Sequence, residues 1–382
     1  MKYVALKDVC KINMGQSPDS SSYNENGEGI PFFQGNADFG ERYPVTRVWC
    51  NAPTKIAQSE DILISVRAPI GALNYAKEKC CIGRGLAAIT PDKSKVSLEF
   101  VYWFLKGKNA ELKSKGTGST FKAISKKILE EILIPDVGFD KQHEYAQMLE
   151  KIYVIIQTRK QELQKLDELI QSRFVELFGD PIKNPKGWEV VKLSECLERI
   201  DNGKSFTCDS NAREGVFPAI LKLSAATYGD YRPYENKALL DEKQFVESVE
   251  VHRGDLLFTR KNTPDLVGMA AYVFETPEKL MMPDLIFRLV TNERMTPTFL
   301  WQLINNREFR PAIQGISGGS AKSMSNISKE RLKNIEVICP PISEQKKLEG
   351  VLEQVDKSKS KIQKSLQETQ LLFDSLMQRY FG

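Results

Sequence analysis

Two short stretches of glycine and serine beside lysine residues are the parts of this chain best suited to holding an anion. Residues 116–120 lie between Lys115 and Lys122, and residues 318–320 come just before Lys322. Glycine leaves backbone N–H groups accessible and lets a phosphate group approach the main chain closely, while lysine supplies positive charge. Each stretch is therefore interpreted as a phosphate-binding loop, with a simple flexible turn as the alternative.

The distribution of charge says more than the net charge of +4. Between residues 106 and 127 seven basic residues stand against one acidic residue, and between residues 307 and 333 six stand against two. A single stretch of this kind is normally a solvated surface. Two of them on a nearly neutral chain indicate an anionic partner that is held at two places.

Sequence patterns of catalysis and cofactor binding are absent. The sequence contains no glycine fingerprint for a dinucleotide, no nucleotide-hydrolase phosphate loop, and no Asn/Asp-Pro-Pro-aromatic tetrad of DNA methyltransferases. Residues 184–187, Asn-Pro-Lys-Gly, lack the second proline and the stacking aromatic of that tetrad, and we interpret them as a turn. We expect the chain to have no catalytic residue and no cofactor of its own.

Seven cysteines and two histidines are spread along the chain without the spacing of a metal site or a disulfide framework. The number of cysteines is odd and no Cys-x-x-Cys pair occurs. We therefore expect no metal, and reduced thiols that are mostly buried. No apolar run is long enough to cross a bilayer and no secretory signal is evident, so we expect a cytoplasmic protein that does not associate with membranes.

The chain repeats itself at a fixed offset. Residues 124–126, Ile-Ser-Lys, recur 203 residues later as residues 327–329, and the same offset pairs Gln142 with Gln345. The fronts of the two halves match at a shorter offset. The matching stretches are residues 2–9 and 189–196, the glycine turns 13–18 and 201–206, and the strand-like runs 60–67 and 254–261. Each half thus has a variable front and a regular back.

The back of each half has the heptad pattern of a long amphipathic helix. The apolar positions of the first helix, expected over residues 142–178, are Tyr145, Leu149, Ile152, Ile156, Leu163, Leu166 and Ile170. Those of the second, expected over residues 345–381, are Leu348, Leu352, Val355, Ile362, Leu366, Phe373 and Leu376. Such a stripe needs an apolar partner, since the isolated helix is unstable in water. The two stripes therefore predict an intramolecular coiled coil.

The fronts are predicted to be mixed α/β domains. Short apolar runs bounded by Gly, Pro and Asp predict strands, and residues 98–107 and 296–305 predict apolar helices that pack on each sheet. The expected divisions are residues 1–140 for the first front domain, 141–180 for the first long helix, 181–342 for the linker and second front domain, and 343–382 for the second long helix.

The order of these features resembles the specificity subunits of type I restriction-modification systems. A front domain, a glycine-serine loop with a following Ile-Ser, an apolar-proline stretch, a glutamine, a long helix and a linker come in turn, and the order then recurs. The matching stretches are GTGSTFKAIS (116–125), ILIPDVGFDKQ (132–142), LIQSRFVELFGDPIKNPKGWEVVKL (169–193), GGSAKSMSNIS (318–328) and VICPPISEQKKL (337–348). The resemblance covers the whole chain.

This resemblance implies an α+β fold of two pseudo-repeated mixed α/β target recognition domains, separated by two long helices that form an antiparallel coiled coil. Each domain would read one half of a split, asymmetric site on double-stranded DNA. The helices would act as a spacer and as the docking surface for two modification subunits, which carry S-adenosylmethionine and methylate adenine. Restriction subunits can join the same assembly. The specificity subunit itself would be non-catalytic.

Base edges are read by Arg, Lys, Asn and Gln side chains on loops, and phosphates by lysines and backbone N–H groups. The candidate DNA-binding residues of the first half are Gln16, Gln34, Asn36, Arg67, Arg84, Lys115, Ser119 and Lys122. Those of the second half are Lys204, Lys222, Arg260, Lys261, Asn262, Ser320 and Lys322. For each residue an ordinary surface or salt-bridge role is the alternative.

Two other functions are alternatives to DNA recognition. A self-contained DNA methyltransferase is opposed by the missing nucleotide and catalytic motifs. A scaffold or decoy of the modification complex would use the coiled coil and would read no DNA itself.

Overall fold

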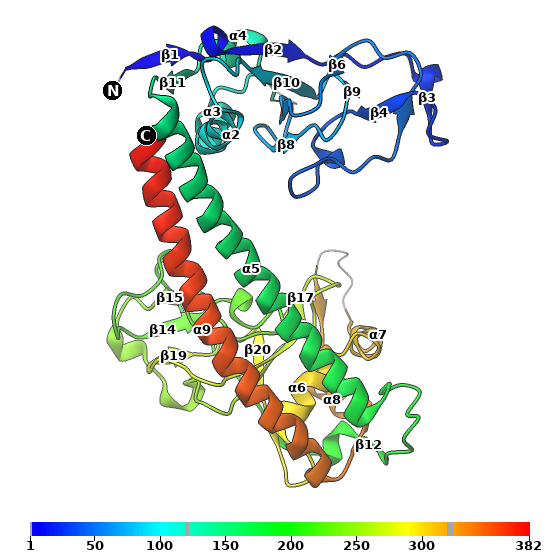
Figure 1. Ribbon diagram of the computed structural model, residues 1–382. Coiled ribbons are helices and arrows are strands. Elements are labelled where there is room, and N and C mark those ends of the chain that lie inside the picture. Colours follow the sequence, from blue (N-terminus) through cyan, green and yellow to red (C-terminus); the bar gives the residue numbers. More distant parts are fainter. Residues whose placement is uncertain (1, 119–121, 319–323) are drawn as a thin grey trace. The chain divides into compact units, whose positions relative to one another are not determined.

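A computed structural model describes most of the chain (Figure 1). The described residues are 2–118, 122–318 and 324–382. They form two compact units, the first made of residues 1–160 with 365–382 and the second of residues 161–364. Two helices of 40 residues, α5 (Phe139–Phe178) and α9 (Ile342–Phe381), contribute to both units. The long helices are thus shared between the units, whereas the sequence led us to divide them from the front domains.

The first unit contains a four-stranded antiparallel sheet in the order β2-β10-β7-β8 and a five-stranded sheet in the order β3-β5-β4-β9-β6. Its elements are β1 (Tyr3–Ala5), α1 (Leu6–Val9), β2 (Cys10–Met14), β3 (Tyr23–Asn24), β4 (Ile30–Phe33), β5 (Trp49–Cys50), β6 (Ile56–Ala57), β7 (Ile62–Ser65), β8 (Leu73–Tyr75), β9 (Cys80–Ile82), β10 (Leu86–Pro91), α2 (Leu98–Gly107), α3 (Asn109–Ser114), α4 (Lys126–Glu130) and β11 (Leu133–Pro135). Strands β4 and β9 are parallel.

The second unit contains a four-stranded antiparallel sheet in the order β13-β20-β16-β18 and a three-stranded sheet in the order β15-β14-β19. Its elements are β12 (Val190–Lys192), β13 (Leu197–Asn202), β14 (Ala219–Leu221), β15 (Asn236–Ala238), β16 (Leu256–Thr259), β17 (Lys261–Asn262), β18 (Ala270–Tyr272), β19 (Leu280–Met281), β20 (Ile286–Thr291), α6 (Pro297–Asn305), α7 (Arg310–Gly315), β21 (Ser325–Asn326), α8 (Lys329–Lys333) and β22 (Glu336–Ile338). Strands β14 and β19 are parallel.

The sequence repeat is also a structural repeat. In each unit the first strand pairs antiparallel with the strand before the long helix, β1 with β11 and β12 with β22. The four-stranded sheets have corresponding orders, and each second sheet holds one parallel pair. Helices α2 and α6 lie within one residue of the segments predicted for them. Each begins at a hydroxyl N-cap, Ser97 or Thr296, whose side chain accepts a backbone N–H.

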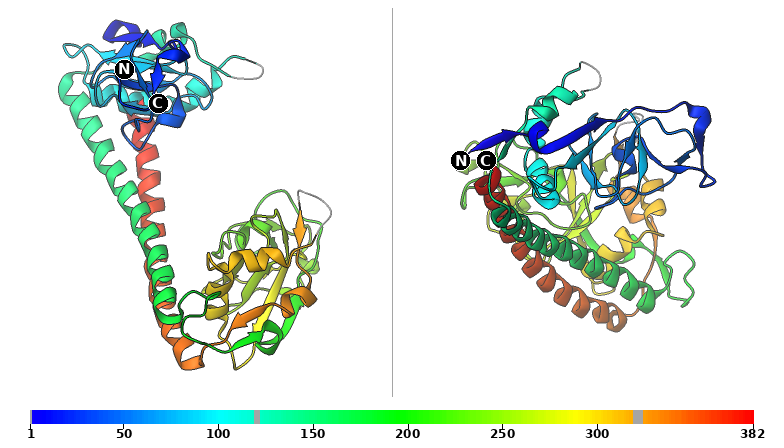
Figure 2. Two further views of the ribbon diagram at one scale, coloured as in Figure 1. Left: turned by 90° about the vertical axis from the view of Figure 1, so that its right-hand side faces the viewer. Right: turned by 45° about the horizontal axis from the view of Figure 1, so that its top comes forward.

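Within each unit the segments of α5 and α9 lie side by side and run in opposite directions (Figures 1 and 2). In the first unit the rings of Tyr145 and Tyr380 stack with centroids 3.9 Å apart. Further along, Trp103 contacts both Tyr153 and Phe373, at 5.4 and 5.7 Å. In the second unit a lysine of α9 pairs with an aspartate of α5 at 2.7 Å.

The apolar stripe of each long helix packs on a front domain as well as on the other helix. Leu149, Ile152 and Ile156 are buried in one core with the apolar face of α2. Leu348 and Leu352 are buried in the same way with α6. Periodicity revealed the stripe but not this second partner. Each fully buried side chain of this kind contributes about 1.5–3 kcal/mol, so the front domains also stabilise the helices.

A buried glutamine ties the start of α5 to the first front domain. The Gln142 side chain, 4% exposed, accepts the N–H of Ser97 through Oε1 at 2.7 Å. Its Nε2 donates to the carbonyl groups of Lys95 and Val137, at 3.3 and 2.8 Å. Since Ser97 is the N-cap of α2, one amide links the long helix, the helix of the front domain and the chain before each of them.

Gln345 makes the corresponding contacts in the second unit. Its Oε1 accepts the N–H of Thr296, the N-cap of α6, at 2.8 Å. Its Nε2 donates to the carbonyl groups of Arg294 and Pro340, at 3.0 and 2.7 Å. The side chain is fully buried. Gln142 and Gln345, the pair that marked the sequence repeat, therefore make the same hydrogen bonds in both units.

Arg42 and Lys106 attach α5 to the first front domain through aromatic rings. The Arg42 guanidinium makes a bidentate ion pair with Glu150, at 2.5 and 2.6 Å, and lies 4.6 Å from the ring centroid of Tyr153. The Lys106 ammonium lies 4.1 Å from the same centroid. Burial, and then the charge of Arg42, lower the pKa of Lys106 to about 8.

All seven cysteines are free, and all but Cys208 are buried, as expected from the sequence. No helix in the described part of the chain is both long and apolar enough to cross a membrane.

Replacing the buried glutamine of the second unit should destabilise that unit. In Gln345→Leu the Thr296 N–H and two carbonyl groups lose their partner, and each unsatisfied buried group costs about 1–3 kcal/mol. We expect a loss of about 2–4 kcal/mol in unfolding free energy, measured by urea denaturation. Gln354→Leu, an exposed position of the same helix, is the control. Equal stability of the two variants would contradict the assignment.

Stability should rise with pH between about 8 and 10 because of Lys106. Its pKa is lower in the folded than in the unfolded chain, so the unfolded chain binds more protons in this window. The penalty of a buried charge, present below pH 8, disappears as the ammonium deprotonates. In the wild type this raises the unfolding free energy by about 1–3 kcal/mol, since one pKa unit corresponds to about 1.4 kcal/mol. We expect Lys106→Met to lack this increase. Lys113→Met, at an exposed lysine, should keep the full pH dependence in denaturation experiments.

Candidate nucleic-acid interface

Tight turns meet at the ends of β2, β4 and β9 in the first unit. Gly15 directly follows β2, and a Cβ atom there would collide with the carbonyl oxygen of Gly83 in the turn after β9. The N–H of Gln16 donates to the carbonyl group of Ile82 at 3.0 Å. Backbone therefore packs on backbone here, which only glycine permits, and the side chain of Gln16 is left exposed.

Arg84 lies at the tip of the turn between β9 and β10, with its side chain exposed. Its N–H donates to the Ser17 hydroxyl at 3.2 Å, and the N–H of Gly85 donates to the carbonyl group of Gln34 at 3.2 Å. These bonds bring together Gln16, Gln34 and Arg84, which are far apart in the sequence.

Arg67 and Lys122 continue this surface on the neighbouring backbone segments. The N–H of Val66 donates to the carbonyl group of Gly85 at 2.9 Å, and the N–H of Ala68 donates to the carbonyl group of Lys122 at 3.1 Å. Both basic side chains are exposed, and neither forms an ion pair within the described residues. We call Gln16, Gln34, Arg67 and Arg84 tip cluster 1.

The second unit repeats this frame of turns. A Cβ atom on Gly203, which follows β13, would collide with the carbonyl oxygen of Pro283 and would lie 2.6 Å from that of Met282. The N–H of Lys204 donates to the Met282 carbonyl group at 3.1 Å. Lys204 therefore occupies the position of Gln16 in the first unit, and its side chain is likewise exposed.

Two more predicted residues of the second unit fall at corresponding positions. Lys222 directly follows β14 of the parallel pair β14–β19, as Gln34 follows β4 of the parallel pair β4–β9. Lys261 pairs with β21, as Arg67 bridges to the corresponding segment of the first unit. Lys222 also lies 3.8 Å from an acidic partner, Glu235.

Asp284 completes this set, and sequence reasoning missed it. It follows Pro283 in the turn between β19 and β20, at the position of Arg84, and its side chain is exposed. Residues 83–85 (GRG) and 283–285 (PDL) share no residue, so no sequence match marks the equivalence. The glycine turns that pack against them were the available signal. We call Lys204, Lys222, Lys261 and Asp284 tip cluster 2.

Arg260 and Asn262 are engaged inside the second unit. The Arg260 guanidinium lies 5.0 Å from the ring centroid of Phe287. Asn262 is 7% exposed, and its amide donates to the Thr227 hydroxyl at 3.2 Å and accepts the N–H of the next residue at 2.8 Å. A base contact by Asn262 would break these bonds, so the structure does not place it with the exposed candidates.

Of the remaining candidates, Asn36 is partly buried in the turn that follows Gln34, and Lys115 pairs with Glu111 at 2.6 Å. Three candidates lie outside the described residues: Ser119, Ser320 and Lys322.

Each glycine-serine loop is closed by reciprocal backbone hydrogen bonds. Thr117 and Ala123 exchange bonds of 3.0 and 2.9 Å, and Gly318 and Asn326 exchange bonds of 2.8 Å. The serine of each following Ile-Ser pair caps a short helix, α4 or α8. The Ile-Ser part of the motif therefore has a structural role. Phosphate binding by the loops themselves stays a prediction.

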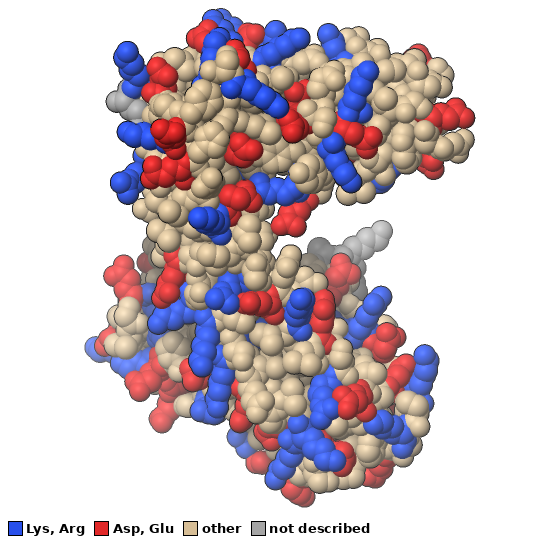
Figure 3. Space-filling model, viewed as in Figure 1, with Lys and Arg blue, Asp and Glu red and all other residues tan. Residues whose placement is uncertain are grey.

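Most residues of the two basic stretches have partners within their own unit. Ion pairs with acidic residues hold Lys108, Lys115, Lys126 and Lys127. Arg310 donates to the carbonyl groups of Val267 and Gly268, at 2.6 Å each. On the face shown in Figure 3, basic and acidic side chains are interspersed. The stretches as a whole are therefore weaker evidence for an anionic partner than their composition indicated.

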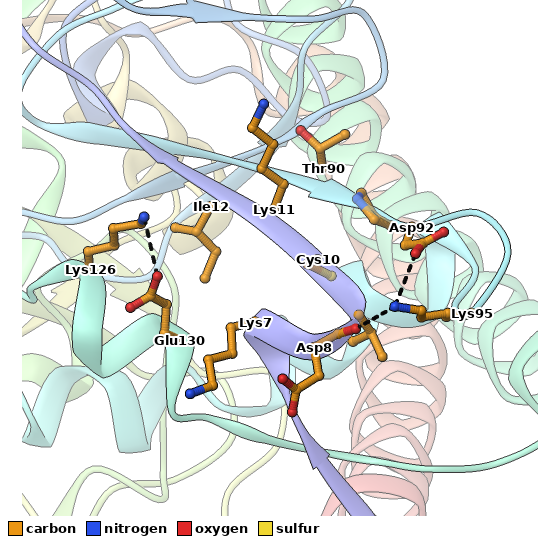
Figure 4. Close-up of a pocket in the computed structure, with 12 residues that line it drawn as sticks. Lys7, Asp8, Cys10, Lys11, Ile12, Thr90, Asp92, Lys95, Lys126 and Glu130 are labelled. Atoms are coloured by element: carbon orange, nitrogen blue, oxygen red, sulfur yellow. Dashed lines mark hydrogen bonds and ion pairs between the residues drawn. The ribbon is translucent and has the colours of Figure 1, made fainter.

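An open cavity of about 550 Å³ lies beside β2 in the first unit, lined by α1, β2, β10 and α4 (Figure 4). Of its four lysines, Lys95 and Lys126 pair with acidic residues of the lining, at 3.3 and 3.2 Å. Lys7 and Lys11 form no ion pair within the described residues. None of the predicted DNA-binding residues lines this cavity, so we assign the candidate interface to the tip clusters.

Comparison with known proteins shows the family. The family model for the type I restriction modification DNA specificity domain matches residues 1–168 and again residues 185–370. The chain belongs to this family. The resemblance seen in the sequence is thereby confirmed, and the two matches give the chain two specificity domains, one for each repeat.

Two relatives carry names that agree with this family. A Methanocaldococcus jannaschii protein named as the MjaX type I restriction enzyme specificity subunit is 47% identical over 158 residues, 41% of this chain and 37% of that protein. The Escherichia coli EcoEI specificity subunit is 32% identical over 204 residues, 51% of this chain and 34% of that protein. The chain thus matches little more than a third of the length of each. The crystal structure of an S subunit from M. genitalium, 14% identical, covers 100% of this chain and 96% of its own with a TM-score of 0.65, which shows the same fold.

Enlarging the glycine under tip cluster 2 should loosen the turns of the second specificity domain. In Gly203→Ala the added methyl group meets main-chain carbonyl groups that cannot move aside as a side chain could. We expect amide hydrogen exchange at Lys204 to become at least about ten-fold faster, since ten-fold corresponds to about 1.4 kcal/mol of opening free energy. Gly315→Ala, where a Cβ meets nothing within 4 Å, is the control. Unchanged exchange in Gly203→Ala would refute the assigned contact.

Proposed function

We propose that this chain is the DNA-specificity subunit of a type I restriction-modification complex, in which each specificity domain reads one half of a bipartite, asymmetric site on double-stranded DNA. The observation that carries the proposal is that the two domains present different polar side chains at equivalent positions of one frame of turns. Two half-sites of different sequence require this combination of a repeated frame with unlike tips.

The side chains of the tip clusters have the chemistry of base recognition. An arginine donates two hydrogen bonds to guanine and a glutamine amide pairs with adenine in the major groove, each contact discriminating by about 1–3 kcal/mol. Tip cluster 1 offers two glutamines and two arginines, whereas tip cluster 2 offers three lysines and an aspartate. The proposed half-sites therefore differ in sequence.

The two long helices are proposed to form an antiparallel coiled coil that spaces the specificity domains. The opposite directions of α5 and α9 within each unit support this proposal. A helix of 40 residues is about 60 Å long at about 1.5 Å per residue. That length suffices to serve two major-groove segments, which lie about 34 Å apart for one turn of DNA.

A groove between the long helices, with both apolar and charged residues, supports the proposal that the helices also bind modification subunits. In the first unit an open groove of about 500 Å³ lies between α5 and α9. The exposed Met148 and Leu372 line it, and so do the charged residues Lys141, Glu144 and Arg379. An amphipathic partner helix, with apolar residues flanked by charged ones, suits such a groove. Two modification subunits, one at each repeat, would contribute S-adenosylmethionine and the adenine methylation, and restriction subunits would join them. This chain would contribute no catalytic residue and no cofactor.

The internal pairing of the basic stretches favours a second candidate, a coiled-coil scaffold or decoy of the modification complex that reads no DNA itself. Phosphate contacts account for most non-specific affinity for DNA, and lysines already paired with glutamates are less available for them. Binding of duplex DNA by the complex with modification subunits separates the two candidates.

Exchange of one specificity domain should change one half of the recognised site. Residues 1–138 would be replaced by those of another family member, a segment that includes both partners of the β1–β11 pair. In the reconstituted complex, mapping of methylated adenines should show one new half-site and one unchanged half-site. The reciprocal exchange of residues 189–340 should alter the other half. A site that changes in both halves, or in neither, would exclude one domain per half-site, and methylation without sequence preference would favour the scaffold.

A further inference from the structure

The two specificity domains carry opposite charges at the tip of the same turn. Arg84 lies between β9 and β10, and Asp284 lies between β19 and β20. The turns correspond residue by residue, since the residue two positions before each tip, Ile82 or Met282, accepts the N–H of Gln16 or Lys204. The glycine that packs against the turn is also the same in both units, Gly15 and Gly203.

Both side chains are available to an outside partner. Arg84 and Asp284 are exposed, and neither forms an ion pair or a side-chain hydrogen bond within the described residues. The other residues of each cluster also differ in charge between the two domains. The neutral amides of Gln16 and Gln34 flank the arginine, whereas Lys204 and Lys222 belong to the cluster of the aspartate.

An aspartate on a DNA-facing surface is informative because phosphate repels it. Carboxylate oxygens only accept hydrogen bonds, and the amino group of cytosine, N4, is the base-edge donor that Asp and Glu contact in the major groove. The lysines of tip cluster 2 offset the repulsion between the carboxylate and nearby phosphates. An arginine has only donors, which suit O6 and N7 of guanine.

We propose that Arg84 and Asp284 are equivalent specificity-determining residues, each of which reads a G·C pair in the major groove, one through the guanine and the other through the cytosine. Arg84 binds guanine O6 and N7 in the half-site of the first domain, and Asp284 accepts a hydrogen bond from cytosine N4 in the half-site of the second. The inference rests on the proposed function, to which it adds the reading residue and the base edge for each half-site.

The test uses the full chain in complex with its modification subunits and measures binding to duplexes that carry the mapped site. Arg84→Ala should reduce discrimination at one G·C pair of the first half-site about ten-fold or more, and Asp284→Ala should do so at one G·C pair of the second. Lys79→Ala and Glu278→Ala, exposed charges at the opposite ends of β9 and β19, should leave both half-sites unchanged.

Modified bases then identify the edge that each residue reads. Replacing the guanine by 7-deazaguanine removes N7 and should weaken wild-type binding while leaving Arg84→Ala unaffected. N4-methylcytosine loses its major-groove amino hydrogen and should weaken the wild type but not Asp284→Ala. Such non-additivity marks a direct contact. Inosine lacks the N2 amino group of guanine but keeps O6 and N7, so its major-groove edge is unchanged. It should leave the effects of Arg84→Ala and Asp284→Ala as they are with guanine.

The outcomes separate this inference from the proposed function. If domain exchange moves a half-site while Arg84→Ala and Asp284→Ala leave the site unchanged, the inference is wrong and the proposed function stands. Half-sites without a G·C pair, or modified bases that weaken variants and wild type equally, also overturn it. If the wild-type complex recognises no sequence, both are wrong. Melting temperatures of the variants equal to that of the wild type show that the fold is retained.

Discussion

The buried glutamine at the start of each long helix is the interaction on which the rest of each unit depends. Gln142 and Gln345 join the N-cap of a front-domain helix to carbonyl groups on both sides of the junction. A helix that left the domain in another direction would leave one buried N–H and two buried carbonyl groups without hydrogen-bond partners. Each unsatisfied group costs about 1–3 kcal/mol. The direction of the long helix is therefore fixed at its first turn. Only with that direction fixed can one apolar stripe meet both the front domain and the other helix.

A second constraint, main chain packed on main chain, holds the turns that carry the tip clusters. Gly15 and Gly203 leave no room for a Cβ atom, and a hydrogen bond from the following residue fastens each turn to the end of a strand. None of these contacts involves a tip side chain. The residue types at the tips can therefore change without cost to the fold, as the substitution of aspartate for arginine between the two units illustrates. A frame held by backbone suits a surface whose side chains must vary.

The sequence predicted what depends on local pattern and missed what depends on contacts between distant segments. Heptad spacing predicted both long helices, although each begins three residues earlier, after Gly138 and Pro341, which were available as start signals. The ion pairs of the first basic stretch join residues three or four positions apart, so the sequence already contained them. The burial of Asn262 and the hydrogen bonds of Arg310 required the folded chain, because their partners come from other segments. The same holds for Asp284, since its equivalence to Arg84 is a matter of strand register rather than of shared residues. The structure shows where the candidate residues lie and which of them are exposed, and their contact with DNA stays a prediction.

The modest net charge of the chain bears on how such a specificity subunit would distinguish its own site from other DNA sequences. Non-specific affinity grows with the number of phosphates neutralised, with a slope of about 0.9 per contact in the salt dependence. Several lysines of the first basic stretch pair with glutamates close in sequence instead. Arg67, Lys204 and Lys261 of the tip clusters are exposed and form no ion pair within the described residues. Under the proposed function the tip clusters would supply base contacts, which discriminate between sequences, beside cations that can contact phosphates. The ratio of specific to non-specific binding would depend on the base contacts, because the phosphate term is common to all sequences and cancels from the ratio.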